Sequence, residues 1–287
     1  MNATHDHTLA FKAAMRAQWD IAAPGWDAHA GDLQSWLAIP TSTMLAMAGV
    51  ETGSKVLDVA AGAGDQTVAA AARTGATGSV LATDLSPAIV ELGRARAARA
   101  GLANVEFQVA DGEALAVATG TFDAAICRLG LMFFPEPLRG IRAMHRALRP
   151  GGGMCSMVFS GRERNPCVGI LMATALEHAG LPPPDPNAPG GLLSLGRPGL
   201  MDTLCRDAGF RDVATVAVDA PFRLPSADHY LAFVRNSAGP ILQILGRLDP
   251  TAAEAAWADM RERLRTFDTA EGWVGPNELL LTAGRRA

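Results

Sequence analysis

The sequence predicts an α/β fold in which helices flank a largely parallel β-sheet. Apolar, strand-like runs alternate with helical stretches from residue 55 onward, and such alternation is typical of parallel sheets. The segment KVLDVAAGAGDQT, Lys55 to Thr67, has the pattern of a strand, a glycine-rich loop and a helix. The chain has 287 residues, 49% of them apolar, which is enough to bury the core of one large domain with an inserted cap.

The N-terminal segment, Leu9 to Trp36, is helical in tendency and rich in aromatic residues. It holds Trp19, Trp26 and Trp36, three of the five tryptophans of the chain. Two interpretations stay open: the rings close a pocket, or they pack a helical hairpin onto the sheet. A short helix from Thr41 to Gly49 is expected to lead into the first strand.

The predicted core elements then follow in regular order. They are the strands Lys55–Ala60, Ser79–Asp84, Val105–Val109, Phe122–Cys127 and Met154–Phe159, and the helices Asp65–Arg73, Pro87–Ala100 and Pro135–Arg149. The helix after Asp84 is marked by Ser86 as its N-cap, by Pro87 in its first turn and by Gly101 just beyond its end. His145 lies on an apolar stripe, where a histidine is more often a packed core residue than a catalyst, so no chemistry is assigned to it.

Beyond Phe159 the pattern changes to helices and loops. The expected elements are a helix near Cys167–Ala179, a stiff proline-rich loop at 181–191, a helix at Leu200–Ala208, a strand at Val213–Val218, a helical cap at Ser226–Thr266 and a last strand at Glu278–Ala283. The proline-rich loop is expected on the surface, near the mouth of a pocket or as a plain connector.

Composition narrows the classes of function. The formal net charge is −4 and no basic run is present, which argues against a nucleic-acid partner. The N-terminus lacks an apolar signal core, and no run of about eighteen uncharged apolar residues follows, so we expect a cytoplasmic protein without membrane insertion. Cys127, Cys155, Cys167 and Cys205 show no CxxC spacing, which indicates reduced thiols and no metal site.

A nucleoside-containing cofactor is indicated by two neighbouring features. Gly62 and Gly64 allow a tight turn after the first strand, and about twenty residues later a second strand ends in Asp84, whose carboxylate suits the two hydroxyls of a ribose. A dinucleotide site would need a third glycine where this chain has Thr67.

The order of the motifs identifies a family resemblance. VLDVAAGAGDQT, ATDLS, VEFQVADGEAL, FDAAICRLGLMFF and LRPGGG resemble the successive motifs of class I S-adenosylmethionine (SAM) dependent methyltransferases, specifically the ubiquinone/menaquinone-biosynthesis-like group, over Ala17 to Phe159. The resemblance implies SAM as cofactor, a small-molecule acceptor, and a Rossmann-like seven-stranded sheet whose last strand is antiparallel. It divides the chain into an N-terminal helical lid (1–50), a SAM-binding core (51–160) and a part that completes the sheet and carries the cap at about 221–270 (161–287). A homodimer is left open.

The same resemblance implies the cofactor-binding residues. Backbone N–H groups between Ala60 and Gly64 would receive the methionine carboxylate, and Asp58 would orient this loop or the cofactor ammonium. Asp84 would bind the ribose, with Leu85 against the adenine. The full expected set is Trp26, Asp58, Ala60, Gly62, Gly64, Gln66, Asp84, Leu85, Asp111, Gly112 and Cys127, with Asp111 and Gly112 at the adenine and Cys127 as a pocket wall. Ala60 replaces the usual glycine, which is tolerable if its backbone angles are ordinary.

Catalytic residues are less well defined. Arg128, at the end of the fourth strand, either holds an anionic or enolate acceptor or forms an ion pair over the sheet edge. His229 and His29 are candidate bases for removing a proton from the acceptor, although a surface position is the alternative for both. Metal is not expected.

The favoured function is methyl transfer to a small, largely apolar acceptor, on oxygen or on an activated carbon. The fourth strand lacks the Asn/Asp-Pro-Pro-aromatic motif of enzymes that methylate planar amines. Apolar cap residues either form the acceptor site or simply pack the cap; they are Phe222, Tyr230, Phe233, Ile241, Leu242 and Leu245. The alternatives are a nucleotide-cofactor oxidoreductase and a SAM-binding protein without methyl transfer.

Overall fold

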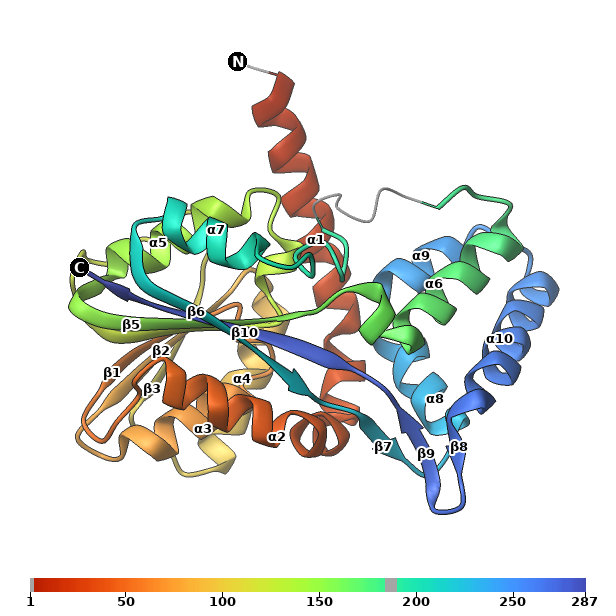
Figure 1. Cartoon of the computed structure of the whole chain (residues 1–287), viewed down its shortest axis with the longest axis horizontal. Helices are drawn as coiled ribbons and strands as arrows, with labels where there is room; N and C mark the ends of the chain where they lie inside the picture. The colour runs from red at the N-terminus through yellow and green to blue at the C-terminus, as the bar shows by residue number, and fades with distance from the viewer. Residues whose placement is uncertain (1–2, 184–189) are drawn as a thin grey trace.

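The computed structural model describes residues 3–183 and 190–287, and it shows a sheet with helices on both faces and a helical cap beyond one end (Figure 1). The strands are β1 (Lys55–Val59), β2 (Ser79–Asp84), β3 (Val105–Val109), β4 (Phe122–Arg128), β5 (Leu148–Phe159), β6 (Phe210–Asp219), β7 (Phe222–Leu224), β8 (Asp268–Thr269), β9 (Gly272–Gly275) and β10 (Glu278–Arg286). The α-helices are α1 (Ala3–Ala28), α2 (Ala30–Met47), α3 (Asp65–Thr74), α4 (Pro87–Arg99), α5 (Pro137–Ala147), α6 (Pro166–Ala179), α7 (Leu200–Asp207), α8 (Ala227–Ser237), α9 (Gly239–Leu245) and α10 (Pro250–Leu264). Short 3₁₀ helices lie at η1 (Leu131–Phe133), η2 (Arg162–Arg164) and η3 (Arg265–Phe267).

The main sheet has seven strands in the order β3-β2-β1-β4-β5-β10-β6. Strands β1 to β5 pair in parallel, whereas β10 is antiparallel to both β5 and β6. The predicted seven-stranded sheet with an antiparallel last strand is therefore confirmed. Because β2 and β4 lie on opposite sides of β1, the chain reverses its direction of winding at β1, and in such sheets ligands bind at the carboxyl ends of the strands at this point.

Helices cover both faces of the sheet. Figure 1 shows α2 and α3 below it and α5 and α7 above it, and α4 packs against β2 and β3 on the side of α3. Side chains that point inward from the strands are apolar and fully buried, among them Leu57, Ile126 and Met157. Burying such side chains is the main source of stability of the sheet.

Two predicted boundaries were wrong. The short helix expected at Thr41–Gly49 is the second half of α2, which continues through Pro40, because Leu37 and Met44 bury one stripe of the whole helix. Strand β5 begins at Leu148, six residues earlier than expected, so the glycines belong to the strand. A Cβ on Gly153 would lie 2.3 Å from the carbonyl oxygen of Ala48, and glycine there lets the end of α2 approach the strand.

The cap has an apolar core of its own, formed by α6, α8, α9, α10 and the small sheet β7-β9-β8. Buried Tyr230 stacks on Trp273, with ring centroids 4.8 Å apart. Trp36 of α2 packs against both this core and the core of the main sheet, and its Nε1 donates a hydrogen bond to the carbonyl oxygen of Ala220. The cap is therefore joined to the sheet by apolar packing.

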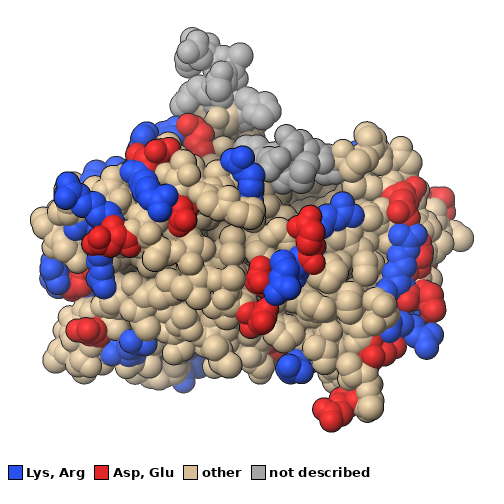
Figure 2. Space-filling model, viewed as in Figure 1, with Lys and Arg blue, Asp and Glu red and all other residues tan. Residues whose placement is uncertain are grey.

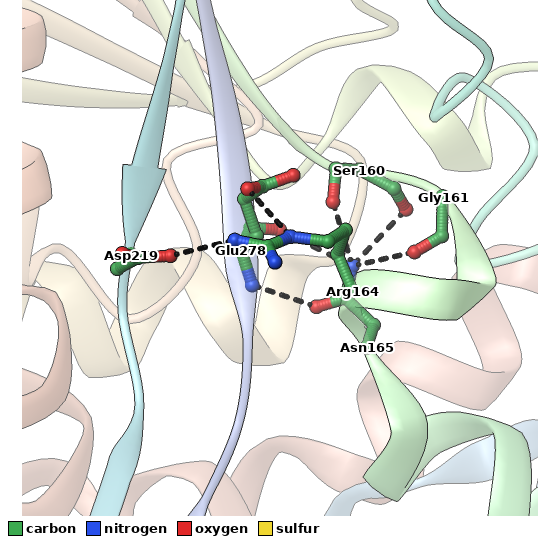
Figure 3. A network of polar contacts seen from close by, with 6 residues as sticks. All are labelled: Ser160, Gly161, Arg164, Asn165, Asp219 and Glu278. Carbon is green, nitrogen blue, oxygen red and sulfur yellow. Dashed lines mark hydrogen bonds and ion pairs between the residues drawn. The ribbon is translucent and has the colours of Figure 1, made fainter.

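A polar junction also fixes the cap to the sheet (Figure 3). The buried Asn165, just before α6, donates hydrogen bonds to the carbonyl oxygens of Ser160, Gly161 and Glu278 and accepts one from the Glu278 N–H. Arg164 pairs with the Glu278 carboxylate at 2.9 Å. The end of β5 and the start of β10 are thus held together where the chain enters the cap.

Residues 184–189 of the proline-rich loop lie outside the described residues, and so does the expectation that this loop runs over the surface near a pocket mouth or serves as a connector. At its described end, the Gly190 N–H donates to the carbonyl oxygen of Met132 in η1. Acidic and basic side chains are interspersed over the face shown in Figure 2. Across residues 3–183 and 190–287, every helix is too short or too polar to span a membrane.

Candidate functional site

A cavity lies at the carboxyl ends of β1, β2, β3 and β4, beneath α1. Its walls come from the loops that follow these strands, from α1 and α2, and from η1. The lining residues are Lys12, Met15, Trp19, Trp26, Leu37, Ala60, Ala61, Gly62, Ala63, Asp65, Gln66, Asp84, Leu85, Ile89, Ala110, Asp111, Gly112, Glu113, Arg128, Leu129, Gly130, Phe133, Phe134 and Pro135. Eight of the eleven predicted cofactor residues line it; Asp58, Gly64 and Cys127 do not.

The loop after β1 reaches the cavity through backbone conformations that side chains disfavour. Gly62 and Gly64 have φ of +58° and +83°, and Ala60 has φ of +55°. The condition under which alanine would be easily tolerated at position 60 is therefore not met: the tight turn at the end of β1 imposes a left-handed conformation on Ala60. Leu129, just after β4, adopts the same conformation at +56°. Such strained residues cluster at functional sites.

Asp84 holds this loop from the end of β2. Its carboxylate accepts hydrogen bonds from the N–H of Gly62 and the N–H of Ser86, each at 3.0 Å. Burial raises the pKa of Asp84, and these backbone N–H donors oppose that rise. Asp84 thus lies at the cavity wall where the sequence placed it, and it also orders the glycine loop.

Asp58, by contrast, is fully buried behind the loop. It accepts hydrogen bonds from Thr67 Oγ1 at 2.6 Å and from Gln66 Nε2 at 3.4 Å. Burial raises the pKa of Asp58 to about 7, although Thr67 and Arg128 counter it. Gln66 also donates to the carbonyl oxygen of Ala61 at 2.8 Å, so its amide supports the loop from the cavity wall. Of the two roles predicted for Asp58, the geometry favours orientation of the loop.

Cys127 and Gly64 are also placed behind the wall. Burial raises the pKa of the Cys127 thiol to about 12, which leaves the sulfur protonated and unreactive at neutral pH. The expectation that it forms a pocket wall was wrong, because the strand turns this side chain into the core. A Cβ on Gly64 would meet the Phe107 ring at 2.9 Å, so this glycine serves packing between α3 and β3.

An ion-pair cluster that the sequence analysis missed lies beside the end of β3. Lys12 of α1 contacts Asp111 at 2.6 Å and Glu113 at 2.5 Å. Burial lowers the pKa of Lys12, but both carboxylates raise it by more, so the ammonium stays charged. Asp111 lies at the predicted place, yet its carboxylate is engaged by α1. Lys12 is one of only two lysines in the chain, and its place in the apolar stretch LAFKAAM was the available signal.

A second ion pair, whose acidic partner the sequence analysis missed, lies at the end of β4. Arg128 donates from Nη2 to Asp65 Oδ1 at 2.5 Å and from Nη1 to Thr41 Oγ1 at 2.9 Å. Of the two interpretations of Arg128, the ion pair is observed. Asp65 is the first residue of α3, where an acidic side chain commonly interacts with the helix N-terminus. Because that common role explains its position, the sequence did not indicate an ion pair with Arg128.

Aromatic rings roof the cavity from α1. Trp19 packs against Trp26 and edge-on against Phe133, with ring centroids 5.7 and 5.2 Å apart. Trp26 in turn contacts Phe233 of the cap. Within the described part of the chain, the buried Trp26 Nε1–H is one of the few polar groups without a hydrogen-bond partner. An indole N–H at a cavity wall is a donor for a bound molecule.

The two candidate histidines lie away from the cavity lining. His29 contacts Asp32 at 3.5 Å and packs edge-on against Phe233, and His229 is exposed in the first turn of α8. The apolar cap residues are likewise packed within the cap core and do not line the cavity. The sequence could not separate these packing roles from an acceptor site, because both need apolar side chains.

Several known proteins are similar to this chain in sequence. The model of the ubiE/COQ5 methyltransferase family matches residues 36–170. Uncharacterized protein Rv1405c of Mycobacterium tuberculosis is 31% identical over 289 residues, which cover 99% of this chain and 98% of that protein. The ubiquinone/menaquinone biosynthesis C-methyltransferase UbiE of Klebsiella pneumoniae is 36% identical over 113 residues, 39% of this chain and 45% of UbiE. The chain belongs to the class I SAM-dependent methyltransferases, and its residues 36–170 are similar to the UbiE type.

Solved structures support the methyltransferase fold. YcgJ of Bacillus subtilis has a TM-score of 0.56 at 17% identity, over 86% of this chain and 98% of that chain. The [4+2]-cyclase SpnF has the same TM-score at 19% identity, over 92% and 95% of the two chains. These likenesses concern the fold alone.

The residues of this methyltransferase fit SAM, which is its cofactor. Gly62 is open toward the cavity, since a Cβ there would meet no heavy atom within 4 Å, and the loop can approach a ligand through its backbone. Carboxylates at the ends of β2 and β3 suit an adenosine, and the unpartnered Trp26 N–H suits an oxygen acceptor. We propose that Ala60, Gly62, Asp84, Leu85, Asp111 and Gly112 hold SAM.

Proposed function

We propose that this methyltransferase acts on a small, largely apolar acceptor and methylates it on an oxygen or on an activated carbon. The observation that carries the proposal is the apolar part of the cavity lining, to which Leu37, Leu129 and the aromatic residues Trp19, Trp26 and Phe133 contribute. Such a wall binds flat apolar molecules through burial and ring contacts. Bound SAM supplies an electrophilic methyl group on a sulfonium.

The protein's own contribution is positioning and exclusion of water. The rings of α1 and η1 cover the acceptor space, and an acceptor held near the methyl group reacts faster because orientation is already fixed. Five of the charged side chains that line the cavity are engaged in two clusters, Lys12 with Asp111 and Glu113, and Arg128 with Asp65. Because these side chains are already paired with one another, the acceptor must lose its proton readily, which favours phenols and enols. The name of the UbiE relatives supports carbon as one of the two acceptor atoms.

The test measures S-adenosylhomocysteine (SAH) formation with a panel of small phenols and enolisable diketones. Anilines and aliphatic amines of the same carbon skeletons serve as matched controls. We expect SAH to form with members of the oxygen and carbon series and the methyl group to be found on oxygen or carbon by mass spectrometry. Turnover confined to the amines, or to large polar acceptors, would overturn the proposed acceptor class.

A further inference from the structure

The cavity carries different charged groups at its two ends. Because the strands lie in the order β3-β2-β1-β4, the residues at or just beyond their carboxyl ends are arranged along the sheet edge as Asp111, Asp84, Ala60 and Arg128. Asp84 and Arg128 follow strands two positions apart, which corresponds to about 10 Å. One end therefore presents carboxylates suited to adenosine, and the other end presents the Arg128–Asp65 pair.

The Arg128–Asp65 ion pair is unusually buried for two charged side chains. The side chains of Arg128 and Asp65 are only 7% and 16% exposed. Burying two charges costs desolvation free energy that their mutual attraction often fails to recover, so stability is a weak reason for such a pair. A guanidinium has five N–H donors, and two of them are used by Asp65 and Thr41 among the described residues. Donors remain for a ligand carboxylate.

We propose that Arg128 and Asp65 bind the methionyl zwitterion of SAM, Arg128 taking the α-carboxylate and Asp65 the α-ammonium. The loop that was expected to receive the carboxylate already uses the N–H groups of Ala61, Gly62 and Gly64 in hydrogen bonds within the protein. With adenosine at Asp84, the methionyl group extends past Ala60 toward β4, where one positive and one negative side chain lie side by side. Lys12, the other cation of the lining, is held at the opposite end by Asp111 and Glu113. The N-terminus of α3 adds favourable potential for the carboxylate. The assignment rests on the cofactor and is independent of the acceptor.

The test compares ligands with and without the amino-acid group. Calorimetry measures the Kd of SAH and of 5′-deoxy-5′-methylthioadenosine for the wild type, Arg128→Met and Asp65→Asn. We expect Arg128→Met to weaken SAH binding about 10- to 100-fold, since a hydrogen-bonded charge is lost, and to leave methylthioadenosine within about twofold. Arg149→Met is the control, because Arg149 also pairs with an aspartate, Asp123, but in a more exposed ion pair at the other end of the strands.

A double variant separates direct binding from repulsion by an unpaired Asp65. If Arg128→Met acts only by exposing the Asp65 charge, Arg128→Met with Asp65→Asn should restore SAH affinity, and that result would overturn the proposal. Direct binding predicts that the double variant stays weak for SAH. Equal weakening of both ligands, or of neither, would also overturn it. If Arg128→Met lacks a cooperative thermal transition, Arg128→Lys takes its place and should weaken SAH selectively, because one amine cannot replace the planar fork.

Discussion

At the scale of single residues, backbone conformation decides how the sheet edge meets its ligand. Ala60 and Leu129 carry side chains yet adopt left-handed φ values at the ends of β1 and β4. Each costs about 1–2 kcal/mol relative to an ordinary conformation. The motif predicted a tight loop with glycine at 62 and 64, but sequence gave no sign that Ala60 is strained, because alanine is normally at ease in strands and helices.

The first prediction concerns Asp84. Asp84→Ala should weaken SAH binding by about 1.5–3 kcal/mol, because it removes charge-assisted hydrogen bonds to the ribose and releases the Gly62 N–H. The SAH affinity of Asp84→Asn, which retains one acceptor oxygen, should lie between those of the wild type and Asp84→Ala. The control is Asp219→Ala, at the exposed far side of the sheet. An unchanged Kd in folded Asp84→Ala would remove this carboxylate from the site.

The second prediction concerns the pH dependence of stability through Asp58. Its pKa is raised from 3.8 to about 7 in the folded protein, so the folded state holds this proton more tightly than the unfolded state does. The contribution of protonated Asp58 to the free energy of unfolding is full below about pH 4 and is lost as the pH rises through 7. The total loss is about 4 kcal/mol, because each pKa unit corresponds to about 1.4 kcal/mol. Urea unfolding between pH 5 and 8 should show a decline that Asp58→Asn flattens. Parallel curves for both proteins would contradict the raised pKa.

At the scale of secondary-structure elements, α1 is the piece that turns a sheet edge into a closed site. It is tied to the core by Lys12 at Asp111 and Glu113 and by Asp20, whose carboxylate accepts from Ser86 Oγ at 2.5 Å. Strands and helices of the core were predictable because each has a clear apolar period and clear end signals. The docking of α1 was not, since its ion pairs and its hydrogen bond join residues about 70 to 100 positions apart, for which a single sequence offers no pairing signal.

The third prediction follows from this docking. A helix that covers a ligand becomes harder to open once the ligand is bound. SAH should therefore slow amide hydrogen exchange in Leu9 to Ala28, whereas α10 in the cap should be unaffected. Equal exchange of α1 with and without SAH would show that its tryptophans only pack against the sheet.

At the scale of the whole molecule, the main sheet and the cap have separate apolar cores with different relations to the cavity. The residues that line the cavity come from positions 12–135, whereas the cap core is built from residues beyond 166, with Trp36 packed against it. The cap reaches the site indirectly, through Phe233 against Trp26. The sequence predicted the cap helices but not the strands β7, β8 and β9, which are short and have no alternating pattern of their own.

The fourth prediction tests this division. Met260→Ala, in the cap core, should lower the free energy of unfolding by about 2–5 kcal/mol, since it removes a fully buried side chain. SAH affinity measured below the unfolding transition should stay within about twofold. Arg261→Ala, its exposed neighbour, is the matched control and should change stability by less than about 1 kcal/mol. A large loss of SAH affinity in folded Met260→Ala would show that cap and cavity are coupled.

We infer that SAM lies along the carboxyl ends of β3, β2, β1 and β4, beneath α1. A crystal structure of the complex with SAH would show the position and direction of the ligand. We predict the adenosine between Asp84, Leu85 and Asp111 and the methionyl group at Arg128 and Asp65, with Trp19 and Trp26 closing over the sulfur. Density for SAH in the reverse direction, or outside this cavity, would show that the cofactor does not bind in this way.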